Sequence, residues 1–349
     1  MIDKIKIAGK YLDQPLLVAK FNQAVPKIFV GGAALYGVNE VRKAPKEKRK
    51  ETAINTFSVL TATVATALAA PKLASKIVKK PYQNFLVKDA VKRNTEIIDE
   101  YISKEPVSRV TENILQKSKT NVLSYKEVKT MCKELRSKDS GKDFLNKLIP
   151  EPENITSKDI KNEIGRLSIL GLIPVAGGVV GGITGEKISK GKLNKENTSN
   201  RVKEGAYQYL ANIFLCNVGA GIALAGMEAC KIKSKAARAI GMTAGIVATG
   251  IVGGSKIANF IGKKVIDPIF DKKEIKNKKN SKPERKPEIV DICLHTDDIA
   301  TIAVMSGLKW IEPALPILYG ISGYRAGIGY RNNKWTENKT PDKHLCVKA

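Results

Sequence analysis

Uncharged apolar stretches alternate with Lys-rich polar stretches along the whole chain. Four of the apolar stretches are long, namely Thr52–Pro71, Leu167–Gly185, Gly205–Met227 and Ala239–Ser255. A helix needs about 20 predominantly apolar residues to cross the hydrocarbon core of a bilayer, which is about 30 Å thick. Each of these four stretches is therefore predicted to form a membrane-spanning helix.

Two further apolar stretches leave the total number of spans open. Ile28–Asn39 has only twelve residues, and Ile299–Tyr324 is interrupted by Lys309, Glu312 and two prolines. The second stretch is either one kinked span or two half-helices. The pattern predicts an all-α, polytopic membrane protein with four spans, and it leaves these two stretches undecided.

Small residues recur at every fourth position within the predicted spans. The rows comprise Ser58, Ala62, Thr66 and Ala70 in the first long stretch, Gly177, Gly181 and Gly185 with Gly178 and Gly182 beside them in the second, and Gly241, Gly245 and Gly253 in the fourth. Residues four apart lie on one helix face, where glycines let another backbone approach closely. We expect these glycine-zipper faces to pack against other membrane helices of the chain or against a second copy of it.

An internal repeat connects two pairs of apolar stretches. Val30–Glu40 resembles Val218–Glu228, and Lys72–Lys80 resembles Lys256–Lys264, although the register requires gaps. Between these markers lie a basic turn and a helix rich in small residues. The repeat predicts a helical hairpin that occurs twice in the chain.

A polar segment between the first two long stretches has the pattern of short amphipathic helices. Ser124 and Glu127 have the spacing of a capping box. The apolar stripe beyond them comprises Val128, Met131, Cys132 and Leu135. This pattern predicts a small helical domain inserted between the membrane helices.

These patterns divide the chain into six parts. They are an N-terminal apolar hairpin (1–75), a polar helical insert (76–163), glycine-rich membrane helices (164–270), a flexible basic linker (271–298), a last apolar segment (299–330) and a disordered basic tail (331–349).

The formal net charge of +26 points to anionic partners. The basic runs 42–50 and 272–286 contain no aromatic residue for stacking on bases, and they flank apolar helices. Anionic phospholipid headgroups therefore fit them better than nucleic acid. We expect a multi-pass protein of the plasma or inner membrane; a soluble or peripheral basic helical protein that binds anionic membranes or nucleic acid is an alternative.

Few residues suggest chemistry. Glu312 and Lys309 lie on one face of the last apolar segment and could form an intramembrane ion pair, whereas an interfacial turn is the competing interpretation. The candidate zinc ligands are Cys293, His295, His344 and Cys346. Their C-x-H spacing is not typical of zinc sites, and a single crossing by the last apolar segment would separate the two pairs. We expect no metal and no cofactor.

No set of residues in the sequence resembles a catalytic nucleophile with its base, and only two histidines are present. We therefore expect a protein that is not an enzyme. Scaffolding, membrane shaping or helix-mediated assembly is the predicted role. A small-solute transporter or channel subunit is the alternative, because glycine-rich helices and an intramembrane carboxylate also occur in such proteins.

Overall fold

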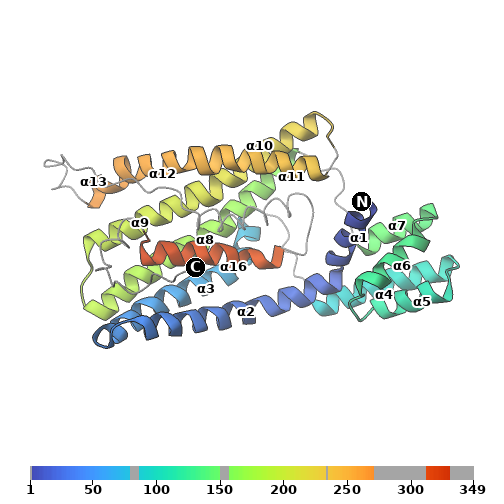
Figure 1. The fold of residues 1–349 in the computed structure, drawn as a ribbon, viewed down its shortest axis with the longest axis horizontal. Coiled ribbons are helices and arrows are strands. Elements are labelled where there is room, and N and C mark those ends of the chain that lie inside the picture. Colours follow the sequence, from blue (N-terminus) through green and yellow to red (C-terminus); the bar gives the residue numbers. More distant parts are fainter. Residues whose placement is uncertain (1, 79–85, 150–156, 233–234, 271–311, 331–349) are drawn as a thin grey trace, which may run out of the picture.

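The computed structural model describes residues 2–78, 86–149, 157–232, 235–270 and 312–330. Within these residues every regular element is helical and there is no strand, which confirms the predicted all-α class. Most of the helices run along the long axis of the molecule, and a group of shorter helices lies at one end (Figure 1).

The helices along the long axis form a bundle. They are α2 (Pro15–Lys43), α3 (Arg49–Val78), α8 (Ser157–Lys190), α9 (Lys195–Tyr209) with α10 (Leu215–Ala229), α11 (Lys235–Ile246) with α12 (Ser255–Ile261) and α13 (Asp267–Phe270), and α16 (Leu315–Ile328). The central member is α8, which packs on α3, α9, α10 and α16. The pairs α2–α3 and α10–α11 are both antiparallel hairpins (Figure 1); the sequence repeat between them stays a prediction.

Short turns of other helical types join these helices. The 3₁₀ turns are η1 (Lys46–Lys48) and η6 (Glu312–Ala314), and the π-helical turns are η2 (Leu210–Phe214), η3 (Val247–Gly254) and η4 (Gly262–Ile266). Because η2 joins α9 directly to α10, these elements form one long continuous helix. In the same way, η3 and η4 join α11, α12 and α13 into a second long helix. The two π-helical turns η2 and η3 contact each other.

Four helical stretches of the described chain are long and apolar enough to cross a membrane. They are Lys46–Val78, Lys158–Lys190, Lys195–Ala229 and Ile240–Phe270. Each overlaps one of the four long apolar stretches of the sequence. Among the described residues, α2 and α16 do not reach the same length and hydropathy, and residues 299–311 of the last apolar segment lie outside the described chain.

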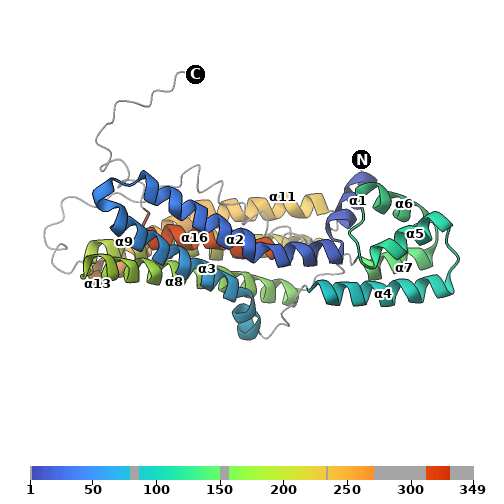
Figure 2. The same ribbon diagram turned by 90° about the horizontal axis from the view of Figure 1, so that it is seen from below.

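The polar insert folds into its own small bundle beyond one end of the long helices (Figure 2). Its helices are α4 (Val87–Lys104), α5 (Arg109–Ser118), α6 (Tyr125–Leu135) and α7 (Asp139–Leu148). The predicted capping box is confirmed, since the Ser124 hydroxyl accepts from the Glu127 backbone and the Glu127 carboxylate accepts from the Ser124 backbone. The predicted apolar stripe of α6 is buried in a core separate from that of the long helices.

The N-terminal helix α1 (Ile2–Leu12) packs on α6 of the insert. Lys10 is buried and donates to the Ile149 carbonyl at 3.2 Å. Just beyond the helix, Gln14 exchanges two hydrogen bonds with the Leu123 backbone, at 2.8 and 3.0 Å. The start of the chain therefore lies with the insert in space, although the sequence pattern grouped residues 1–75 with the first hairpin. Its buried polar side chains find their hydrogen-bonding partners there.

The capping box predicts a pH-dependent stability of the insert. The hydrogen bond from Lys117, at 2.6 Å, and those from Ser124 lower the pKa of Glu127 from 4.5 to about 2. The stability that the Glu127 carboxylate contributes is therefore complete above pH 4.5 and is lost as the pH falls towards 2. We expect Glu127→Gln to cost about 1 kcal/mol at pH 7 and almost nothing near pH 2.

Amide hydrogen exchange of α5 and α6 at neutral and acidic pH measures this difference. Glu96→Gln is the control, because the Glu96 carboxylate is exposed and lies 4.0 Å from Lys92. An equal cost of Glu127→Gln at both pH values would contradict the role assigned to its charge.

Candidate functional site

The glycines of α8 lie on two adjacent faces, and each face packs on a different helix. Gly177, Gly181 and Gly185 face α3. A Cβ atom on Gly181 would lie 2.7 Å from the Ala62 Cβ, and one on Gly185 would lie 2.9 Å from the Ser58 Cβ. The row of small residues on α3 is therefore the partner of this glycine row.

The second face of α8 packs on α16. A Cβ atom on Gly178 or on Gly182 would overlap the carbonyl oxygens of Gly323 and Gly327, respectively. Nothing larger than glycine fits at such a backbone approach. The sequence analysis did not single out Gly323 and Gly327, which have the same four-residue spacing.

In the third glycine row, on α11 and η3, only some of the positions four residues apart make close helix contacts. A Cβ atom on Gly241 would overlap the flexible Met227 side chain, and one on Gly245 would overlap the Gly219 carbonyl of α10. Gly253 has only ordinary van der Waals contact, 3.5 Å from the Ala248 carbonyl. Gly253 therefore makes no close contact with another helix of the described chain, and its contact with a second copy of the chain stays a prediction.

The physical reason is the π-helical turn η3. A turn with i→i+5 hydrogen bonds advances the contact face by one residue, so a four-residue rhythm no longer follows it. Gly250 and Gly254 take the place of Gly253, since Cβ atoms there would overlap Cys216 and lie 2.8 Å from the Ala211 Cα.

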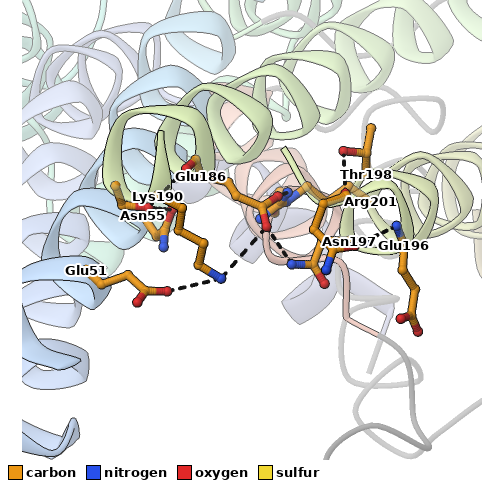
Figure 3. A network of polar contacts seen from close by, with 11 residues as sticks. Glu51, Asn55, Glu186, Lys190, Glu196, Asn197, Thr198 and Arg201 are labelled. Carbon is orange, nitrogen blue, oxygen red and sulfur yellow. Dashed lines mark hydrogen bonds and ion pairs between the residues drawn. The ribbon is translucent and has the colours of Figure 1, made fainter. Parts of the chain in front are cut away.

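Glu186 continues the second glycine row of α8, four residues after Gly182, and is only 1% exposed. Its two carboxylate oxygens accept from Arg201 at 2.5 Å and from Asn197 at 2.6 Å, both on α9. Arg201 also donates through Nε to the Gly327 carbonyl of α16 at 2.9 Å. These contacts, most of which appear in Figure 3, join three helices through one buried ion pair.

A more exposed layer extends the network to α3. Lys190 lies 3.2 Å from the Glu51 carboxylate and 3.9 Å from that of Glu186. The Ser189 hydroxyl donates to the Asn55 side chain at 3.2 Å. Figure 3 shows Lys190 between the two carboxylates. We call this group of contacts, from Glu51 to the Gly327 carbonyl, the ion-pair network.

The contacts of the ion-pair network hold neighbouring helices together. Each oxygen of the Glu186 carboxylate accepts from a donor on α9, so the side chain is tied to a neighbouring helix. The Arg201 guanidinium is shared between a carboxylate and a helix C-terminal carbonyl, which are the groups that a cation stabilises best. The network therefore ties the ends of α3, α8, α9 and α16 together.

A second cluster lies at the opposite end of the apolar stretch of α8. Arg166 contacts Glu163 at 2.5 Å and Glu312 at 2.9 Å, and these three side chains are 12–23% exposed. Glu312 is thus paired across helices with Arg166, a partner that was not predicted from the sequence. Lys309 and the candidate zinc ligands Cys293, His295, His344 and Cys346 lie outside the described residues.

A third polar feature is a buried row on α9 and η2 that the sequence analysis missed. The Gln208 amide donates to the Glu204 carboxylate at 2.8 Å, and the Asn212 amide donates to Gln208 at 3.0 Å. All three side chains are at most 4% exposed. Their i, i+4, i+8 spacing, which runs into the apolar stretch Gly205–Met227, was the signal that could have found them.

Comparison with protein-family models, with curated proteins and with solved structures finds no match to this chain. What its site can do is therefore read from the contacts above. They pair the buried Glu186 with Arg201 on a neighbouring helix and place two ion clusters at the two ends of the uncharged stretch of α8.

Proposed function

We propose that the chain is an integral, multi-pass membrane protein that acts as a helical scaffold. The observation that carries this proposal is the outward face of α8. Nineteen residues from Leu167 to Gly185 carry no charge, and as a helix they extend over about 28 Å, close to the thickness of a hydrocarbon core. Leu172 and Val180 on this stretch are 41% and 61% exposed.

The two ion clusters support the same placement. The Arg166 cluster precedes the uncharged stretch and the ion-pair network follows it, so each lies where a membrane–water interface would be. Charged side chains are tolerated at such a depth when they pair with one another or reach the interface. The intervening part of α8 contacts its neighbours through glycines and apolar side chains.

The other candidate spans also carry large apolar side chains on their outer surface. Ile222 on α10, Ile240 on α11 and Phe260 on α12 are 64%, 71% and 62% exposed. Extended exposed apolar surface is unfavourable in water and is typical of surface that meets lipid or a partner. A bilayer around the bundle accounts for this exposure.

A scaffold is favoured over a transporter because most of the buried charges are held in pairs between helices. Closely packed glycine faces between α3, α8 and α16 also leave little space within the bundle. Dispersion contacts between such faces are a main source of helix association when lipid is as apolar as the partner helix. The predicted activity is therefore assembly rather than catalysis.

Extraction of a membrane fraction with alkaline carbonate tests whether the protein is integral. We expect the full chain to remain in the membrane pellet, since several apolar helices would have to leave the bilayer together. Release into the supernatant would favour the peripheral alternative, in which the net charge of +26 holds a soluble bundle on anionic lipids.

A small-solute transporter is the second candidate, and the buried row of Glu204, Gln208 and Asn212 favours it. π-helical turns are frequent at functional sites, and buried ionisable groups in membrane helices often mark ion and solute pathways. Reconstitution into liposomes distinguishes the two functions. A solute flux that Glu204→Gln abolishes would support transport, whereas liposomes as tight as protein-free ones support the scaffold.

A further inference from the structure

An apolar groove of about 510 Å³ lies between α2 and α16, separate from the ion-pair network. Ile28, Gly32 and Ala33 line it from α2, and Ile317 and Ile321 line it from α16. This volume lies within the range of about 300–1,000 Å³ that is usual for small-molecule sites. The groove is therefore large enough for an elongated apolar ligand.

One end of the groove is cationic and aromatic. Arg325 lines it, is 6% exposed, and has its guanidinium carbon 4.3 Å from the centre of the Tyr330 ring. Tyr36 and Tyr324 form an edge-to-face pair beside it, with ring centres 5.2 Å apart. Aromatic rings and a guanidinium are typical of the boundary between hydrocarbon and headgroups.

The depth of the groove matches one leaflet of a bilayer. Arg325 lies two residues before Gly327, whose carbonyl is part of the ion-pair network at one end of the uncharged stretch. From that level the groove extends along α2 from Tyr36 back to Ile28. Eight helical residues cover about 12 Å, slightly less than half of a hydrocarbon core of about 30 Å.

We propose that this groove binds one acyl chain of an anionic phospholipid, whose phosphate contacts Arg325. The proposal rests on the membrane location argued above. A guanidinium binds phosphate through two parallel hydrogen bonds, and the apolar walls exclude water from the chain. Arg42 and Lys43 in the last turn of α2 add positive charge at the same end of the bundle and favour a headgroup with net negative charge.

Two neighbouring glycines provide a matched test of the groove. A Cβ atom on Gly31 or on Gly32 would meet no heavy atom within 4 Å, so the two positions are matched in the space around the first added carbon. Only Gly32 lines the groove. Gly32→Leu therefore fills the groove, whereas Gly31→Leu adds the same side chain on the same helix outside it.

The measurement is the amount of phosphatidylglycerol that stays with the full chain after purification from phosphatidylglycerol–phosphatidylcholine vesicles, counted by mass spectrometry. We expect about one bound phosphatidylglycerol for the unchanged protein and for Gly31→Leu, and a loss of at least about tenfold for Gly32→Leu, equivalent to 1.4 kcal/mol or more. Arg325→Gln should abolish the preference for phosphatidylglycerol over phosphatidylcholine.

Equal retention by Gly31→Leu and Gly32→Leu, or equal retention of the two lipids by the unchanged protein, would overturn the groove as a lipid site. Equal retention by the two glycine variants is also the result expected if another segment of this chain fills the groove. These outcomes leave the membrane location intact, because carbonate extraction of the same variants reports it separately. Release of the unchanged protein by carbonate would instead overturn the proposed function.

Discussion

Arg201→Met is expected to destabilise the protein by about 3–5 kcal/mol, because it leaves the buried carboxylate of Glu186 with only the more distant Lys190 as a cation. Glu186 is 1% exposed and lies between α8 and α9, where Arg201 donates to it. The Gly327 carbonyl at the end of α16 also loses its donor. The unfolding midpoint in detergent should fall accordingly.

The double variant Glu186→Leu with Arg201→Met provides the decisive control. Replacement of a buried ion pair by apolar side chains of similar volume is often neutral, so the double variant should recover much of the lost stability. Lys192→Met, at an exposed position in the loop between α8 and α9, should have an effect within about 0.5 kcal/mol. A double variant as unstable as Arg201→Met would show that the charge pair is not the source of the loss.

Gly181→Leu is expected to disrupt the contact between α8 and α3 and to cost about 3 kcal/mol or more. The first added carbon would already lie 2.7 Å from both the Ala62 Cβ and the Ser58 carbonyl oxygen. Backbone atoms cannot move aside as a flexible side chain can, so the two helix axes must separate. Close contacts along the whole glycine face are then lost together.

Val180→Leu is the matched control, because Val180 is the preceding residue of α8 and is 61% exposed. It should change the thermal midpoint in detergent by no more than a surface substitution does, within about 0.5 kcal/mol. Crosslinking between α3 and α8 should persist in this variant and be lost in Gly181→Leu. Equal behaviour of the two variants would mean that the glycine spacing reflects composition alone.

The helical class and the long apolar helices could be predicted from the sequence because they depend on local patterns. An uncharged stretch such as Leu167–Gly185 satisfies its backbone within one helix wherever it lies. The capping box at Ser124 and Glu127 is local for the same reason. Such features require no knowledge of which helices are neighbours.

The ion-pair network could not be predicted in the same way, because its members come together only in the folded bundle. Glu186 and Arg201 are 15 residues apart on different helices. Glu186 extends the row of Gly178 and Gly182, and its burial was not predicted from the sequence. A buried carboxylate requires a cation. The residue that supplies this cation depends on how α9 packs against α8 in the folded bundle.

Two further positions show what local patterns leave out. For Glu312 the sequence offered a pair with Lys309 or an interfacial turn, and the structure adds Arg166 on α8 at 2.9 Å, while Lys309 lies outside the described residues. Gly253 was placed in a row that assumes 3.6 residues per turn, and the π-helical turn η3 breaks that assumption. In both cases a tertiary contact or a change of helix type overrides a local rule.

The most direct test of the membrane location uses single cysteines at exposed positions along α8. Lys161, Ala176 and Ile188 are all exposed and lie before, within and after the uncharged stretch. Each is replaced by Cys in a chain whose five native cysteines are changed to Ala. A membrane-impermeant maleimide is then added to both sides of open membranes.

We expect rapid labelling at positions 161 and 188 and none at 176, because lipid covers the middle of the helix, and equal labelling of all three after denaturation. Labelling of position 176 as rapidly as the other two in intact membranes would contradict the account, since it would show that the outward face of α8 meets water along its whole length.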